Sequence, residues 1–347
     1  MGERLDARRL AQLVKGFRSV RLLVLGDVVL DEYLAGDVDR VSPEAPVLVV
    51  HVRRESQVLG GAGNVVRNVV ALGGVCTFCS AIGDDRAGDR VLELLAEQGV
   101  ATEGVVRVAG RPTTRKTRVV ARGQQVVRFD RETQEPLPPR AARALLAALD
   151  AAVPRVDGAV FEDYRKGTLA APTVRAALRR LAAARVPVDV DPKEELALYR
   201  GVELIKPNLR EASALTGVAI RSDADLSRAA QKLRRRLGGA AVVVTRGAEG
   251  MAFFDGDGAG TAVATPRREV FDVQGAGDTT IATLALALRA GASLLEAVVL
   301  ANAAAGVVVA KSGTATATPA ELLDALPAAL AAAREATEAR APKGGRA

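Results

Sequence analysis

One acidic residue, Asp278, follows three small residues at the start of a helix-forming stretch. Gly275, Ala276 and Gly277 interrupt an extended segment, and the apolar run 281–288 comes directly after. Backbone N–H groups at a helix N-terminus have no partner within the helix and attract anions. A carboxylate there can accept a proton from an alcohol while the amides hold a migrating phosphoryl group. The pattern indicates phosphoryl transfer to a hydroxyl; a tight turn with Asp278 as a helix cap is the alternative.

Two further stretches carry groups suited to binding a polyol. Residues 21–26 form an apolar run typical of a buried parallel strand, and Asp31 lies just beyond its carboxyl end, where open α/β sheets bind ligands. Gly60 and Gly61 permit close backbone approach, and the Asn64 side chain both donates and accepts hydrogen bonds. These residues must be brought to Asp278 by a fold that alternates strands and helices.

These motifs resemble the two signatures of the PfkB (ribokinase-like) carbohydrate kinases. The Gly-Ala-Gly-Asp at 275–278 is similar to the C-terminal signature, and Gly-Gly-Ala-Gly-Asn at 60–64 to the N-terminal one. The resemblance implies that Asp278 is the catalytic base and that ATP is the phosphoryl donor. It also implies an anion hole and a sugar site, formed respectively by Gly275, Ala276 and Gly277, and by Asp31, Gly60, Gly61 and Asn64.

A more specific resemblance comes from residues 26–31 and from Arg-Val-Ser-Pro-Glu-Ala-Pro at 40–46. Together they look like the D-glycero-β-D-manno-heptose-7-phosphate kinases of lipopolysaccharide-core biosynthesis. The implied reaction transfers the γ-phosphoryl group of ATP to O1 of the heptose 7-phosphate. A nucleotidyltransferase domain follows the kinase in bifunctional members; because the chain ends soon after the kinase region, we expect a stand-alone kinase.

Residues 37–52 and 113–130 are rich in β-branched residues, and the second stretch predicts a hairpin turning at Arg122 and Gly123. The two stretches match the position of the family's lid, a small sheet that excludes water from the reaction. The basic residues Lys116, Arg118 and Arg128 are either edge-strand charges or partners of a phosphate on the substrate.

Lysines follow two other predicted strands, at positions 166 and 193. Their recurrence at strand ends favours phosphate contacts over a surface role: Lys166 with the substrate and Lys193 with the nucleotide. Asn208 and Glu211 resemble the family's Asn-x-x-Glu, which is associated with Mg²⁺; helix capping would explain Asn208 but not Glu211. We expect Glu211 to act on Mg²⁺ through water.

Three further nucleotide-binding residues are implied by the resemblance. Thr245 and Gly247 end a β-branched strand and would lie near the ATP phosphates or ribose, while Asn302 would lie at the adenine pocket. For the stretch around Asn302, close helix packing is the alternative explanation.

Composition excludes several other classes of protein. The net charge is +7, but aromatic residues make up only 3% and there is no Trp, which argues against single-stranded nucleic acid as a partner. The single histidine, His51, excludes a Ser-His-Asp hydrolase and a multi-histidine metal centre. Cys76 and Cys79 form a C-x-x-C inside an apolar run, so we expect a buried strand with free thiols.

The sequence predicts a three-layer α/β fold with a mainly parallel sheet and a small β lid. We expect residues 1–332 to form the kinase domain and 333–347 a frayed, disordered tail. No signal peptide or membrane span is evident, so we expect a soluble cytoplasmic protein that does not bind membranes. Its partners would be ATP, Mg²⁺, a sugar phosphate and a second copy of the chain joined through the lid. Alternatives are another PfkB sugar kinase, of the ribokinase or fructose-phosphate kinase type, and a non-catalytic sugar-phosphate sensor.

Overall fold

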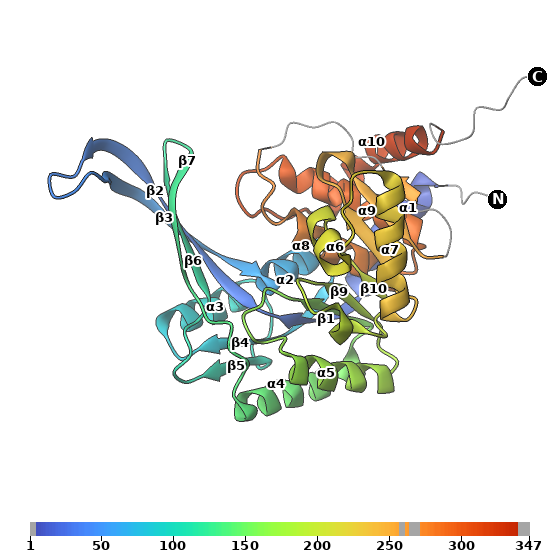
Figure 1. Cartoon of the computed structure of the whole chain (residues 1–347), viewed down its shortest axis with the longest axis horizontal. Coiled ribbons are helices and arrows are strands. Elements are labelled where there is room, and N and C mark those ends of the chain that lie inside the picture. The colour runs from blue at the N-terminus through green and yellow to red at the C-terminus, as the bar shows by residue number, and fades with distance from the viewer. Residues whose placement is uncertain (1–4, 257–260, 264–270, 339–347) are drawn as a thin grey trace, which may run out of the picture.

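A computed structural model describes residues 5–256, 261–263 and 271–338 (Figure 1). A nine-stranded sheet forms the centre of the main body. In spatial order its strands are β13 (Thr261–Val263), β12 (Met251–Phe254), β11 (Ala241–Thr245), β10 (Leu204–Ile205), β9 (Val188–Asp191), β8 (Gly158–Glu162), β1 (Arg21–Gly26), β4 (Val75–Gly83) and β5 (Val105–Val108). Only β12 pairs antiparallel with its neighbours, so the predicted mainly parallel sheet is confirmed.

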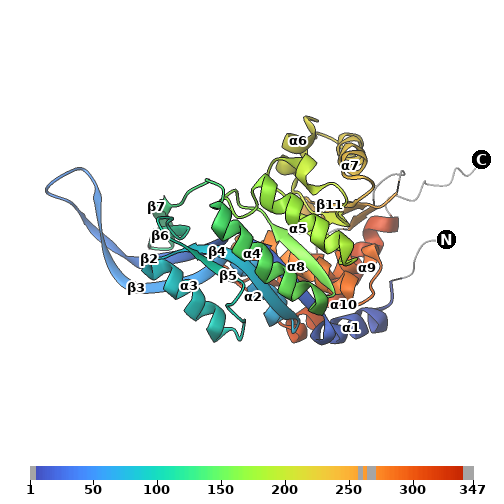
Figure 2. The same ribbon diagram turned by 90° about the horizontal axis from the view of Figure 1, so that it is seen from below.

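Helices cover both faces of this sheet, as Figures 1 and 2 show. One face packs against α1 (Ala7–Gly16), α2 (Ala62–Ala71), α3 (Arg86–Glu97), α8 (Ala276–Arg289), α9 (Leu294–Val309) and α10 (Pro319–Glu338). The other face packs against α4 (Pro139–Ala152), α5 (Ala171–Ala183), α6 (Leu209–Thr216) and α7 (Asp223–Leu237). Helix α10 continues to Glu338, beyond the predicted start of the tail at 333, and residues 339–347 lie outside the described residues.

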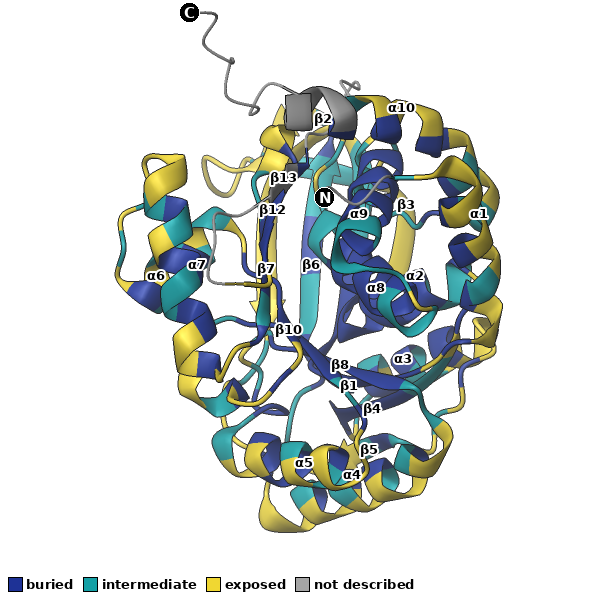
Figure 3. Ribbon diagram, turned by 90° about the vertical axis from the view of Figure 1, so that its right-hand side faces the viewer, coloured by how far each residue is buried: buried dark blue, intermediate teal, exposed yellow. Residues whose placement is uncertain are grey.

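The central strands contribute side chains to two separate hydrophobic cores, because successive side chains of a strand point to opposite faces of the sheet. In β1, Leu22 and Val24 pack with the α8 side, whereas Leu23 and Leu25 pack with the α4 side. Figure 3 shows the resulting buried layer through β1, β8, α8 and α9. The same two-residue period decides which way a polar residue points at the end of a strand.

A second, four-stranded sheet projects from the main body and forms the lid (Figures 1 and 2). Its order is β3 (Leu48–Gly61), β2 (Val28–Val41), β6 (Arg115–Ala121) and β7 (Gln124–Arg131). The predicted segment 37–52 is only the outer part of a longer hairpin, since β2 begins two residues after β1 ends. The predicted turn is present: Arg122 and Gly123 have φ of 51° and 76°, as a two-residue hairpin loop of type I′ requires.

The two faces of the lid differ in character. The strand pairings place Asp31, Tyr33, Lys116, Arg118 and Arg128 on one face. The opposite face is rich in apolar residues, namely Leu34, Val38, Val50, Val52, Val119, Val127 and Phe129, of which Phe129 is 52% exposed. The lid thus has a polar face and an apolar face with little cover in this chain.

Both cysteines lie in β4 as free thiols, as the sequence predicts. Burial raises the pKa of the Cys76 thiol and raises that of Cys79 to about 12, so neither is a thiolate near neutral pH. His51 lies in β3 beside Asp39. None of the helices in the described residues combines the length and the apolar character needed to span a membrane.

Candidate active site

A pocket of about 240 Å³ lies between the polar face of the lid and the start of α8. It brings together residues that the sequence places more than 200 positions apart, Asp31 and Asp278 among them. Its lining residues are Val29, Asp31, Gly60, Gly61, Lys116, Arg118, Arg128, Tyr164, Gln274, Gly275, Asp278 and Thr314. Most of the predicted sugar site, one residue of the predicted anion hole and the predicted base therefore share one pocket.

Two hydrogen bonds hold the carboxylate of Asp278. It belongs to the first turn of α8 and is only 6% exposed. The Asn64 side-chain amide donates to Oδ2 at 2.7 Å, and the Tyr164 hydroxyl donates to Oδ1 at 3.1 Å. Asn64 thus contacts the carboxylate predicted to be the base, while the sugar contact predicted for Asn64 stays a prediction.

Burial raises the pKa of Asp278 to about 6. The hydrogen bond from Asn64 opposes this rise, and the charge of Asp191 adds to it. A carboxyl whose pKa lies near neutral pH is ionised in the cell and is still basic enough to take a proton from an alcohol. The environment of Asp278 is therefore that of a general base.

The backbone next to Asp278 lies so close to neighbouring side chains that larger residues would contact them. Gly275 precedes α8 with φ of 78°, and a Cβ there would lie 2.7 Å from Asn64 Nδ2. A Cβ on Gly277 would lie 3.3 Å from Lys206 Nζ. The backbone N–H of Ala276, between them, donates to the Val273 carbonyl oxygen at 3.4 Å. The anion hole predicted at Gly275, Ala276 and Gly277 stays a prediction.

The sugar side of the pocket is built on Asp31 and the glycines of β3. A Cβ on Gly60 would lie 1.9 Å from Asp31 Oδ2, so only glycine leaves room for this carboxylate. The Arg118 guanidinium donates to Asp31 Oδ1 and lies 5.3 Å from the centre of the Tyr33 ring. Arg118 thus offsets the buried charge of Asp31 within the pocket.

The other basic residues predicted to bind the substrate are paired with two acids. Lys116 Nζ lies 2.8 Å from Asp130 and 3.2 Å from Glu132, and Arg128 lies 3.0 Å from Asp130. Lys166 Nζ lies 2.7 Å from Glu132. Lys116 and Arg128 line the pocket, whereas the structure does not place Lys166 among the lining residues.

A cluster of buried charges beside Asp278 was missed by the sequence reasoning. Oxygen atoms of Glu162, Asp191 and Asp278 all lie within 4.8 Å of one another, and Lys206 Nζ lies 2.6 Å from Asp191 Oδ2. Burial raises the pKa of Glu162 well above its usual value, with help from the neighbouring acids. Burial lowers the pKa of Lys206, but the charges of Asp191 and Glu162 raise it by more than burial lowers it. Lys206 therefore stays charged.

The two-residue period of the strands explains this cluster. Glu162 and Asp191 end β8 and β9 and pair side by side, and Lys206 follows β10. In each case, the residue two positions earlier in the chain faces away from the α4 side. Side chains two positions apart in a strand point the same way, so Glu162, Asp191 and Lys206 point toward α8. The signal was present in the sequence as three charged strand ends, yet only the lysines at 166 and 193 were assigned.

Lys193, Asn208 and Glu211, three of the residues predicted to bind the nucleotide, lie together. Lys193 Nζ donates to Glu211 Oε1 at 2.6 Å. Asn208 and Glu211 form a complete capping box at the start of α6, so the expectation that capping would not explain Glu211 is wrong. Both oxygens of Glu211 are engaged in these contacts, which leaves its predicted action on Mg²⁺ through water as a prediction.

The remaining predicted nucleotide residues lie apart from the 240 Å³ pocket. Thr245 ends β11 and bridges to Asn208, and Gly247 begins the next turn with φ of 59°. Asn302 is buried within α9. Their contacts with ATP stay predictions.

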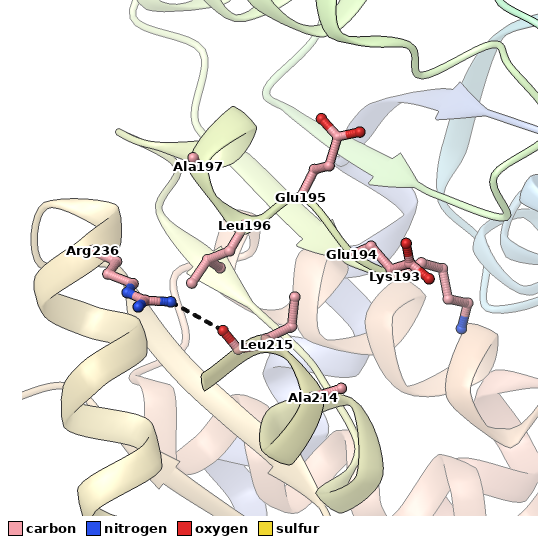
Figure 4. Close-up of a pocket in the computed structure, with 8 residues that line it drawn as sticks. All are labelled: Lys193, Glu194, Glu195, Leu196, Ala197, Ala214, Leu215 and Arg236. Carbon is pink, nitrogen blue, oxygen red and sulfur yellow. Dashed lines mark hydrogen bonds between the residues drawn. The ribbon is translucent and has the colours of Figure 1, made fainter. Parts of the chain in front are cut away.

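A second pocket, of about 670 Å³, lies behind Lys193 (Figure 4). Leu196, Leu215 and Arg236 contribute to its lining. The Lys193 ammonium points away from Leu196 and Ala214 in this view and pairs with Glu211. Neither Asp278 nor the glycines of the smaller pocket are among the lining residues of this one.

Residues 21–321 match the pfkB family of carbohydrate kinases, and the chain belongs to this family. It is a phosphotransferase that acts on a sugar hydroxyl. The proteins named bifunctional protein HldE from Pelobacter propionicus and Trichlorobacter lovleyi are 44% and 45% identical to it, each over 93% of this chain and 66% of their own length. The chain thus spans about two thirds of the length of these curated relatives.

Solved structures show the same fold. Arabidopsis thaliana ribokinase complexed with ribose and ATP has a TM-score of 0.71 at 22% identity, over 88% of this chain and 98% of its own. Escherichia coli phosphofructokinase-2 in complex with potassium has a TM-score of 0.73 at 23% identity, over 89% and 99%. The ribokinase-like architecture predicted from the sequence is confirmed.

The pKa of Asp278 predicts a pH dependence of catalysis. Because its ionised form is the base, kcat/KM should fall tenfold per pH unit below about pH 6, the raised pKa. Steady-state rates between pH 5 and 8 at fixed ionic strength would measure this. A profile that stays flat down to pH 5 would contradict the assigned base.

A second prediction concerns the space next to Asp31. Gly60→Ala places a Cβ 1.9 Å from Asp31 Oδ2, so the carboxylate must move and KM for the sugar should rise by about tenfold or more. Gly256→Ala is the matched control, since a Cβ there meets nothing within 4 Å. Equal KM values in the two variants would show that Asp31 does not hold the sugar.

Proposed function

We propose that the chain phosphorylates D-glycero-β-D-manno-heptose 7-phosphate at O1, with ATP as donor, to give the 1,7-bisphosphate. The single observation that carries a kinase reaction is the convergence of Asp278, Asp31 and Gly60 on one pocket. The choice of sugar rests on the resemblance of residues 26–31 and 40–46 to heptose kinases, and it agrees with 44% identity to the bifunctional HldE protein. The product would serve lipopolysaccharide-core biosynthesis in the cytoplasm, where ATP is available.

In the proposed reaction, Asp278 Oδ1 or Oδ2 takes the proton of the sugar O1 as this oxygen attacks the γ-phosphorus of ATP. The first-turn amides at Gly275, Ala276 and Gly277 face the transferring phosphoryl group, where charge develops. Asp31 and the backbone at Gly60 orient the sugar, and Lys116 and Arg128 face its 7-phosphate. The lid excludes water, which favours transfer to the sugar over hydrolysis.

The buried acids fit the Mg²⁺ that accompanies ATP. Both oxygens of Glu162 and Oδ1 of Asp191 are buried, and none of them has a hydrogen-bond partner in the part of the chain that the structure describes. Oxygen donors of this kind suit a hard cation, which would keep several of its waters. Glu162 and Asp191 would hold Mg²⁺, and Glu211 would act on it through water; the cation would offset the negative charge of the nucleotide phosphates.

A coupled ADP-release assay across a sugar and sugar-phosphate panel tests this function. The wild type should prefer the heptose 7-phosphate, and Asp278→Asn should lower kcat by about 10²–10⁴-fold because the general base is lost. Asp189→Asn, which removes a different buried carboxylate on β9, is the control and should retain activity. Preference for ribose or fructose 6-phosphate would contradict the proposed specificity, and no turnover on any sugar would favour a sensor.

We further propose that two chains pair through their lids. The apolar lid face carries Val127 and Phe129, which are 48% and 52% exposed. A contiguous apolar patch of this kind is typical of a protein interface. Because the polar face of the lid lines the pocket, pairing through the apolar face would leave the sugar site accessible.

Light scattering coupled to size-exclusion chromatography would measure the oligomeric state. The wild type should have twice the chain mass of 36.1 kDa, and the double variant Val127→Asp, Phe129→Asp should elute as a monomer because it buries two charges in the interface. Val75→Asp changes an equally exposed valine at the start of β4 and should stay dimeric. A monomeric wild type would end this proposal.

A further inference from the structure

The carboxylate of Asp27 is buried directly after β1, and the reaction proposed above assigns it no role. It accepts three backbone hydrogen bonds from one loop: from Tyr164 N at 3.1 Å, from Lys166 N at 2.9 Å and from Thr168 N at 2.9 Å. A carboxylate that accepts several backbone N–H groups fixes the segment that donates them. Asp27 therefore holds the whole loop that follows β8.

The loop that Asp27 contacts has an unusual backbone conformation. Arg165 has φ of 55°, which an arginine adopts only under constraint, and Gly167 has φ of 89°. A Cβ on Gly167 would lie 1.9 Å from the Glu135 carbonyl oxygen. The loop is thus a strained turn clamped between Asp27 and the chain at Glu135.

The side chain that this loop presents is Tyr164. Its hydroxyl donates to Asp278 Oδ1, and its ring lies 5.3 Å from Lys193 Nζ on the nucleotide side. The ring also lines the sugar pocket. Tyr164 therefore touches the catalytic carboxylate, the sugar side and the nucleotide side at once.

We propose that Asp27 and Tyr164 act as one positioning unit for the catalytic base: Asp27 fixes the loop, and the Tyr164 hydroxyl fixes the orientation of the Asp278 carboxylate opposite Asn64. The Tyr164 hydroxyl donates this bond at 3.1 Å, from the side of the carboxylate opposite the Asn64 amide. Without this bond, Asp278 keeps only the Asn64 donor and can rotate away from the attacking hydroxyl. Asp27 acts only through Tyr164.

A double-mutant cycle tests this unit, and its kinetic part rests on the proposed kinase function. Tyr164→Phe keeps the ring and should lower kcat about tenfold, the effect of one hydrogen bond to a charged group, while KM for the sugar changes much less. Asp27→Asn cannot accept from all three amides, so it should lower kcat to a similar extent. The double variant should lose no more than the worse single variant, whereas a loss equal to the product of the two would overturn the proposal.

Two measurements need no turnover and so separate this inference from the proposed function. In hydrogen exchange, the amides of residues 164, 166 and 168 should exchange faster in Asp27→Asn and remain protected in the control Asp189→Asn. The side-chain carboxyl ¹³C signal of Asp278, assigned with Asp278→Asn, should move in both Tyr164→Phe and Asp27→Asn. Unchanged exchange or an unmoved signal would overturn the proposal even if the wild type is an active kinase.

If Asp27→Asn does not fold, Gly167→Ala displaces the same loop by another route, since its Cβ meets the Glu135 carbonyl. It should also lower kcat and move the Asp278 signal, and it should add little to Tyr164→Phe. A fully active, folded Gly167→Ala with an unmoved signal would count against the unit.

Discussion

A carboxylate that is buried and still ionisable is the constraint on which the site depends. Asp278 is removed from water at the start of α8, which disfavours its charge, and two donors from distant segments offset part of that penalty. Asn64 comes from the helix that follows the lid hairpin, and Tyr164 from the loop that follows β8. The result is a carboxyl group with a pKa of about 6, which depends on three chain segments that meet at this point rather than on any one of them.

Charged residues from separate chain segments also meet at the carboxyl ends of the parallel strands. Each of the strands β8 and β9 ends in a carboxylate that points toward α8, and the residue after β10 is a lysine pointing the same way. Asp191 pairs with Lys206, which leaves Glu162 without a partner among the described residues. This edge of the sheet therefore holds both signs of charge beside Asp278.

Much of the fold and part of the site could be predicted from the sequence, because local patterns carry them. The apolar run at 21–26 and the strand ends predicted a mainly parallel sheet, and the turn at Arg122 and Gly123 predicted the lid hairpin. Asp278 was predicted from the small residues before a helix, Asp31 from its position beyond the end of a buried strand, and Gly60 from the close backbone approach that glycine permits. Glu211 was misjudged, since a capping box and a phosphate-binding motif use the same spacing.

By itself, then, the sequence determined the alternation of strands and helices, the lid and the acidic residue at the start of a helix. These features follow from patterns only a few residues long, namely the periodicity of apolar residues and the positions of glycines. Only the tertiary structure decided that Asn64 and Tyr164 both donate to Asp278, over 214 and 114 positions of the chain. It also decided that Glu162 and Asp191 lie beside that carboxylate. The reason is that strand order and register, which bring such residues together, arise from packing across the whole sheet and leave no local pattern to read.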